Sequence, residues 1–175
     1  HTRNVPDEVL KRVAKNGGVI MLNFYPAFLD SRTNKEDNER AAKLKPQIDA
    51  LKEQFKNDQQ GYFAAERKLF AENPIYMPDY KRIVDHIDHI KNVAGIDIVG
   101  LGSDFDGVPF LPDGMNGAED LVLVTYEMLK RGYSETDIKK VLGENFLRAF
   151  AQAEKVAKSS SKNISGDGSL KKLGK

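Results

Sequence analysis

The sequence predicts an α/β fold built around parallel strands, and two observations support this. Two apolar runs of strand length, residues 18–25 (GVIMLNFY) and 96–102 (IDIVGLG), lack polar alternation, which is typical of strands covered on both faces. Between them, residues 78–94 carry Ile and Val at helical spacing, as expected of the crossover helix in a strand-helix-strand unit.

The predicted sheet is incomplete. Two parallel strands alone are not stable, because each keeps an unpaired edge and an uncovered face. We therefore expect the chain to be the last part of a repeating βα protein whose earlier strands lie upstream of His1. The alternative is a small two-layer fold that is whole. Residues 1–3 (HTR) are neither a start methionine nor a signal peptide, so we expect the true beginning to be missing or processed away.

Composition narrows the function classes. A chain of 175 residues, 40% of them hydrophobic, can bury one ordinary core. The formal net charge is +1 with both signs interspersed, so we expect no nucleic acid or anionic membrane as partner. No cysteine is present, which excludes disulfides and thiolate metal sites. The compartment stays open, with a periplasmic or exported location favoured over a cytoplasmic one.

The first expected helix begins near Pro6, where a missing N–H is harmless, and acidic residues in its first turn suit the helix dipole. Gly17 follows its last residue. The stripe expected to be buried consists of Val9, Leu10 and Val13. The apolar run 18–25 comes next and is expected to be a doubly buried strand.

Residues 30–77 form an insertion between this strand and the crossover helix. Apolar residues recur from 44 to 55 at helical spacing among many Lys and Glu. We expect Pro46 to kink or restart that helix, and a second helix near residues 62–70 to fold back as a hairpin. Because the insertion follows a strand, it would rise from the catalytic face of a barrel and could act as a lid. An oligomer contact or a solvated decoration is the alternative.

After the second strand we expect a loop, then a helix over residues 118–131 that stops at Gly132. Ser134 and Asp137 resemble a capping arrangement for the next helix. A last helix is expected over residues 144–157. The remaining residues, 158–175, are polar and rich in Gly and Ser, which predicts a disordered tail; its glycosylation-like tripeptide NIS is ascribed to chance.

Two carboxylates follow the second strand in the stretch GLGSDFDG, residues 100–107. Asp104 lies at the carboxyl end of a predicted parallel strand, where catalytic and binding residues of such sheets gather, which suggests a metal or proton-transfer site. A calcium loop fails on spacing. A phosphatase of the haloacid dehalogenase type remains open, with Asp104 as nucleophile, although Val108 replaces the expected hydroxyl residue. The alternative is a purely structural role, in which Asp106 caps the turn and Asp104 accepts backbone hydrogen bonds.

His86 and His89 lie three residues apart on the crossover helix. Two ligands on one turn could hold zinc, but the motif lacks the glutamate and the spacing of zinc peptidases, and this helix packs outside the sheet. We therefore expect packing or capping roles for both.

Four blocks together carry a family resemblance: RNVPD at residues 3–7, VIMLNFY at 19–25, DHIDHIKNVAGIDIVGLGSDFDGVP at 85–109 and GENFLRAF at 143–150. In this order they resemble the C-terminal part of the membrane (renal-type) dipeptidases, peptidase family M19. The resemblance extends from His1 to about Phe150, and the insertion is similar to that of the longer bacterial members.

The resemblance implies the C-terminal part of a (β/α)8 TIM barrel of the metal-dependent hydrolase type, with residues 30–77 inserted after the penultimate strand. Residues 1–157 would be the C-terminal portion of a single dipeptidase barrel domain. It also implies two zinc ions, bridged by a carboxylate and a hydroxide, that activate water to cleave dipeptides. The family's zinc ligands lie on earlier strands, upstream of His1. We therefore predict no metal ligand in this chain and no activity of the isolated chain.

Four residues carry the predicted site. Arg3 matches the family arginine that binds the substrate's C-terminal carboxylate, for which a guanidinium fork is suited. Asp104 matches the family aspartate near the metals, which engages the amino end of the dipeptide or handles protons. Asn23 and Tyr25 are expected to line the site, with barrel packing as an equal alternative.

The predicted partners are a dipeptide substrate and the missing N-terminal half of the same barrel, with a homodimer left open. Two other functions remain alternatives: the dehalogenase-type phosphatase, and a catalytically inert barrel homologue that only binds.

Overall fold

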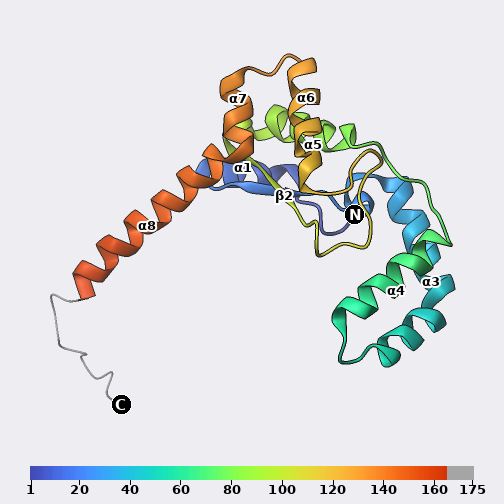
Figure 1. Cartoon of the computed structure of the whole chain (residues 1–175). Coiled ribbons are helices and arrows are strands. Elements are labelled where there is room, and N and C mark those ends of the chain that lie inside the picture. Colours follow the sequence, from blue (N-terminus) through green and yellow to red (C-terminus); the bar gives the residue numbers. More distant parts are fainter. Residues whose placement is uncertain (165–175) are drawn as a thin grey trace.

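The computed structural model describes residues 1–164, and their side chains through residue 160. Its two strands, β1 (Ile20–Asn23) and β2 (Val99–Ser103), pair in parallel and are linked by a crossover that contains helix α5 (Lys81–Ala94) (Figure 1). The parallel strand-helix-strand unit is therefore confirmed. The other elements are α1 (Asp7–Asn16), α2 (Pro26–Leu29), α3 (Ser31–Gln54), α4 (Gln59–Ala71), α6 (Leu121–Lys130), α7 (Glu135–Lys139), α8 (Asn145–Ile164) and the short turns η1 (Ile96–Ile98), η2 (Ala118–Asp120) and η3 (Lys140–Glu144).

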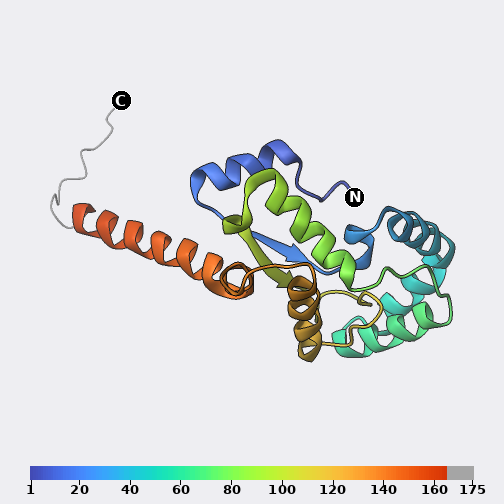
Figure 2. The same cartoon turned by 90° about the horizontal axis from the view of Figure 1, so that it is seen from above.

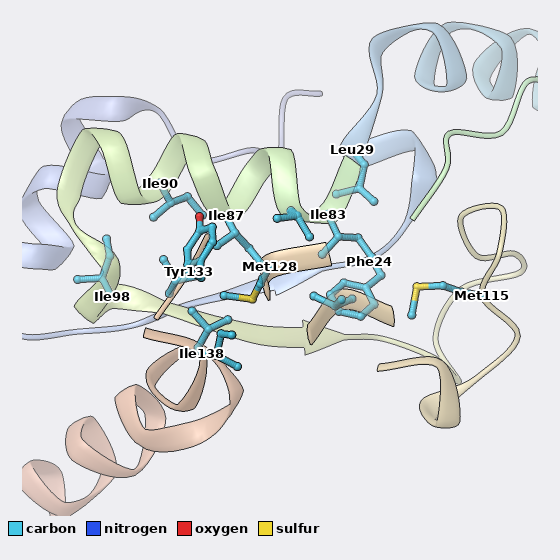
Figure 3. Close-up of a cluster of buried hydrophobic side chains, with 14 of the residues drawn as sticks. Phe24, Leu29, Ile83, Ile87, Ile90, Ile98, Met115, Met128, Tyr133 and Ile138 are labelled. Atoms are coloured by element: carbon cyan, nitrogen blue, oxygen red, sulfur yellow. The ribbon is translucent and has the colours of Figure 1, made fainter. Parts of the chain in front are cut away.

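The core lies between α5 and the sheet (Figure 3). Ile83 and Ile87 of α5 have no exposed surface, and they fall on one helix face because they are four residues apart. Phe24 after β1 and Met128 of α6 are equally buried in the same cluster. The apolar stripe predicted on the crossover helix is confirmed.

The two strands are shorter and less covered than the sequence suggests. Residues 96–98 form the 3₁₀ turn η1, so β2 begins only at Val99. Met21 of β1 is 43% exposed, which corrects the expectation of a doubly buried strand. Within residues 1–164 the sheet has two strands, and no further element of this part of the chain covers the Met21 side chain of β1.

Helix α1 begins after Pro6 and ends at Gly17, whose φ of 76° lies in the left-handed region that glycine adopts freely. Leu10 is buried and Val13 packs against the core, as expected. Val9, however, is 38% exposed. The apolar stripe predicted for α1 is therefore too wide by one residue, Val9, because α1 contacts the described part of the protein along a narrower face.

The insertion is a helical hairpin of α3 and α4, at the opposite end of the molecule from α8 (Figures 1 and 2). The hairpin itself is as predicted. Helix α3 does not restart at Pro46, as one of the two expectations had it, but continues through it. Pro46 and Ala42 are both exposed, so the proline ring points to solvent and water can satisfy the carbonyl that loses its partner.

Helix α6 ends just before Gly132, whose φ is 80°. Ser134 caps α7, and its hydroxyl accepts a hydrogen bond of 3.1 Å from the Asp137 N–H, as predicted. Helix α8 runs to Ile164 and projects away from the body (Figure 2), so the predicted end at residue 157 is wrong. The physical reason is that neither Gly nor Pro interrupts residues 144–164.

Residues 165–175 of the predicted tail lie outside the described residues. Across the described helices, none is long and apolar enough to cross a membrane.

Candidate active site

The end of β2 turns sharply and exposes Asp104. A register shift between Leu22 and Asn23 leaves Gly102 as an extra residue in β2, and a bulge of this kind re-aims the residues that follow it. A Cβ at Gly102 would lie only 2.9 Å from the carbonyl oxygen of Met21, so only glycine allows this close approach. Strand β1 therefore helps to set the direction in which the chain leaves β2.

Two consecutive residues after the bulge have left-handed backbones. Ser103 has a φ of 48° and Asp104 a φ of 84°, a region that non-glycine residues rarely occupy and that costs of the order of 1–3 kcal/mol per residue. The next residue, Phe105, packs edge-on against the buried Phe24 ring, with centroids 5.9 Å apart. With Phe105 anchored in the core, the strained turn holds the Asp104 side chain at the surface.

Asn23 joins the ends of the two strands. Its side-chain N–H donates a 2.8 Å hydrogen bond to the Asp104 carboxylate, and its side-chain oxygen accepts one of 2.7 Å from the Tyr25 N–H. The structure thus brings two of the predicted site residues, Asn23 and Asp104, together at the ends of adjacent parallel strands. Asn23 fixes one carboxylate oxygen and leaves the other to different partners.

Tyr25 is held by its hydroxyl as well as by its ring. The hydroxyl donates a hydrogen bond to the Asp37 carboxylate of α3. Burial first, and then this hydrogen bond, raise the pKa of Tyr25 well above its usual value, so the hydroxyl keeps its proton. The ring packs against Phe28 and Phe110, with centroids 5.0 and 5.2 Å away. Tyr25 therefore offers the site its ring rather than a free hydroxyl.

Arg3 is exposed and is one of the residues that line a hollow with a volume of about 640 Å³. The guanidinium carbon of Arg3 lies 5.0 Å from the centroid of the Phe28 ring, a cation–π distance. Asn23 lines the same hollow, as do Met21 of β1 and His86 of α5, so the hollow extends along β1 as well as to its end. Phe28 is a candidate site residue that the sequence did not single out, because an aromatic residue after a strand looks like ordinary core.

The two helical histidines already have partners, but the packing or capping role expected of both does not describe His89, which is exposed. The Nε2 atom of His86 lies 2.8 Å from the Leu29 carbonyl oxygen, and Nε2 of His89 lies 2.8 Å from an Asp7 carboxylate oxygen. In the described part of the chain, no group of three or more His, Asp or Glu side chains could hold a metal ion. The described residues by themselves therefore do not form a complete metal centre.

Parallel strands joined by a helix, with polar side chains at their carboxyl ends beside a hollow, define an α/β protein of the class whose active sites lie at that edge of the sheet. The sequence profile of membrane dipeptidase, peptidase family M19, matches residues 1–164, and the chain belongs to this family. Membership in a peptidase family overturns the alternative of a dehalogenase-type phosphatase with Asp104 as nucleophile.

Relatives agree with this assignment. The chain is 34% identical over 159 residues to dipeptidase tcpJ of Claviceps purpurea (strain 20.1), covering 91% of this chain and 28% of that protein. The crystal structure of the probable dipeptidase PvdM from Pseudomonas aeruginosa is similar with a TM-score of 0.63 at 26% identity, covering 87% of this chain and 41% of that one. That of dipeptidase AC, a metallopeptidase of family M19, has the same fold over 83% of this chain and 31% of its own, with a TM-score of 0.54 at 24% identity. The chain therefore spans less than half the length of these relatives.

Proposed function

We propose that the whole protein hydrolyses dipeptides with two zinc ions, and that this chain supplies the surfaces that grip the two ends of the substrate. One observation carries the proposal: an exposed cation, Arg3, and an exposed anion, Asp104, are linked by a series of contacts. The Phe28 ring lies under Arg3 and against the Tyr25 ring. Asn23 accepts a hydrogen bond from the Tyr25 N–H and donates one to Asp104. A dipeptide presents the complementary pair of charges, a carboxylate at one end and an ammonium at the other. Family membership supports the reaction class.

The zinc ligands and the earlier strands would belong to the part of the same protein that precedes His1. Three features support this part of the proposal: the chain covers only part of each relative, β1 exposes Met21, and apolar side chains of α8 point outward without cover. These α8 residues are Phe146, Leu147 and Phe150, each more than 40% exposed at 45%, 61% and 54%. In a (β/α)8 barrel these surfaces would be covered, and Asn23 and Asp104 would face the metals from the strand ends.

The test uses the complete protein expressed from its own start codon. We expect close to two zinc ions per subunit, and cleavage of dipeptides that a chelator abolishes. Because Arg3 and Asp104 would each bind one charged end, N-acetylated and C-amidated versions of a good dipeptide should lose most of their kcat/KM. A folded, complete protein that binds dipeptides without metal or cleavage would instead establish the inert homologue.

Gly107 offers a second prediction, because it lies directly under the Asp104 carboxylate. Its N–H donates a 3.1 Å hydrogen bond to the Asp104 carbonyl oxygen, and a Cβ at Gly107 would lie 2.0 Å from Asp104 Oδ1. Gly107→Ala should therefore push the carboxylate off Asn23 and lower kcat/KM by about tenfold or more, the cost of misplacing a catalytic group by an ångström.

The melting temperature of the Gly107→Ala protein separates this effect from misfolding, since the carboxylate is a flexible exposed tip that can move without unfolding the chain. An unchanged kcat/KM in a fully folded variant would show that the position of Asp104 seen here is not the one used in the reaction.

A further inference from the structure

One charged side chain of the insertion is buried although its helix is largely solvated. Arg40 of α3 has a side-chain exposure of only 5%, and arginine is almost never buried this far unless it is paired. Its Nη2 donates a 2.6 Å hydrogen bond to Asp37 Oδ1, and the other Asp37 oxygen accepts the Tyr25 hydroxyl. Asp37 thus connects the buried cation of the insertion to a residue two positions from Asn23.

Aromatic rings complete the surroundings of Arg40. Its guanidinium carbon lies 4.2 Å from the centroid of Phe70 in α4 and 4.7 Å from that of Phe110, which belongs to the loop after β2. Phe110 in turn packs on Tyr25, with centroids 5.2 Å apart. We name this set the Arg40 cluster; its members are Tyr25, Asp37, Arg40, Phe70 and Phe110.

A purely structural role would explain only part of this cluster. Closing the hairpin requires Arg40 to contact Phe70 and the Asn73 carbonyl oxygen, 3.5 Å away, and apolar residues would do that without burying a charge. The Nε atom of Arg40 is buried without a hydrogen-bond partner, which adds to the cost. Hairpin closure does not require the contact of Asp37 with Tyr25 or that of Arg40 with Phe110. Tyr25 and Phe110 lie on the segments that leave β1 and β2 after Asn23 and Asp104.

We infer that Asp37 and Arg40 are positioning residues. They fix the rings of Tyr25 and Phe110, which form an aromatic wall of the substrate site, and so set which substrate side chains the site accepts. This inference rests on the proposed dipeptidase function. Tyr25 is the shared element, because its ring also contacts Phe28, the ring beneath Arg3. If Arg3 binds the C-terminal carboxylate, the wall meets the side chain of the C-terminal residue. The insertion then shapes specificity through fixed contacts with the site.

The test compares Arg40→Met, Asp37→Asn and Tyr25→Phe in the complete protein, with kcat and KM measured for two dipeptide series. One series varies the C-terminal residue from Gly to Phe, and the other varies the N-terminal residue in the same way. We expect the KM ratio between large and small C-terminal residues to change by about fivefold or more, within the range that a hydrophobic pocket contributes to discrimination. The N-terminal series should change much less, and the kcat of Arg40→Met and Asp37→Asn should stay within about twofold.

Lys45 and Asp49 provide the matched control, because they form an ion pair on the same helix with side chains 71% and 51% exposed. Lys45→Met and Asp49→Asn should leave both series unchanged. Arg40→Lys should not restore the wild-type ratio, since an ammonium lacks the planar fork and stacks poorly on aromatic rings. Tyr25→Phe keeps the ring and the fold, so it remains informative if the Arg40 variants do not fold.

Two failures are distinguishable. If the wild-type protein cleaves no dipeptide, the proposed function is wrong. Suppose instead that the protein cleaves dipeptides and that the variants lower its melting temperature, while the changes in kcat and in KM are the same for every substrate. The Arg40 cluster then only stabilises the hairpin, and the inference is overturned.

Discussion

Replacing Asp104 with asparagine is expected to lower the kcat/KM of the complete protein for dipeptides by about 100-fold or more, the usual cost of removing a proton-transferring or charge-binding carboxylate. The change removes the charge and little else. Asparagine tolerates the left-handed backbone at this position, and its side-chain oxygen can still accept the hydrogen bond that Asn23 donates. The loss should therefore arise from chemistry and not from a changed fold.

Asp106 supplies the control for this substitution, since it is an exposed aspartate two residues further along the same loop. Asp106→Asn should change kcat/KM by less than about threefold, as expected for a surface side chain away from the reacting groups. Zinc content and melting temperature should be equal in both variants and the wild type. Full activity of Asp104→Asn under these conditions would remove Asp104 from the site.

The second large effect concerns stability. Asn145 is 3% exposed, and its side-chain N–H groups donate to the carbonyl oxygens of Ile96 at 2.7 Å and Val99 at 2.9 Å. These carbonyls lie on either side of the turn η1, where β2 begins. Asn145→Ala leaves the buried Val99 carbonyl and the partly buried Ile96 carbonyl without this donor. The free energy of unfolding should therefore fall by about 2–6 kcal/mol, at about 1–3 kcal/mol per unsatisfied group.

Urea unfolding of the complete protein measures this loss, with Glu154→Ala, an exposed change on the same helix, as the control. The kcat of the folded Asn145→Ala protein should remain near the wild-type value, because Asn145 supports the opposite end of β2 from Asp104. A loss no greater than that of the control would mean that water replaces the asparagine at little cost.

The same block of sequence contains a second residue with a supporting role. Arg148 donates to three backbone carbonyls, those of Gly17 at 2.6 Å, Gly18 at 3.2 Å and Asp97 at 2.9 Å. These carbonyls precede β1 and β2, so Arg148 ties together the starts of both strands. The block GENFLRAF, which contributes to the family resemblance, thus contains residues that hold the starts of the strands, whereas Asn23 and Asp104 lie at their ends.

Several features of this protein follow from the sequence alone, because they depend on neighbours within a few residues. The buried face of α5 arises from the spacing of Ile83 and Ile87, and the end of α1 from the left-handed freedom of Gly17. The cap of α7 needs only Ser134 and the N–H three residues on. One non-local feature also follows: Asn23 and Asp104 each end a predicted parallel strand, and parallel strands bring their carboxyl ends to one edge of a sheet.

Other features were decided by the tertiary structure. The link from Arg40 to Phe110 and the bonds from Asn145 to Ile96 join residues far apart in the chain, and nothing local distinguishes Arg40 from the exposed cations around it. Residues 96–98 look like a strand but turn, and the buried Asn145 side chain then binds their first carbonyl. Periodicity and turn chemistry report local preferences, whereas burial of a charge or an amide depends on which distant groups the fold places around it.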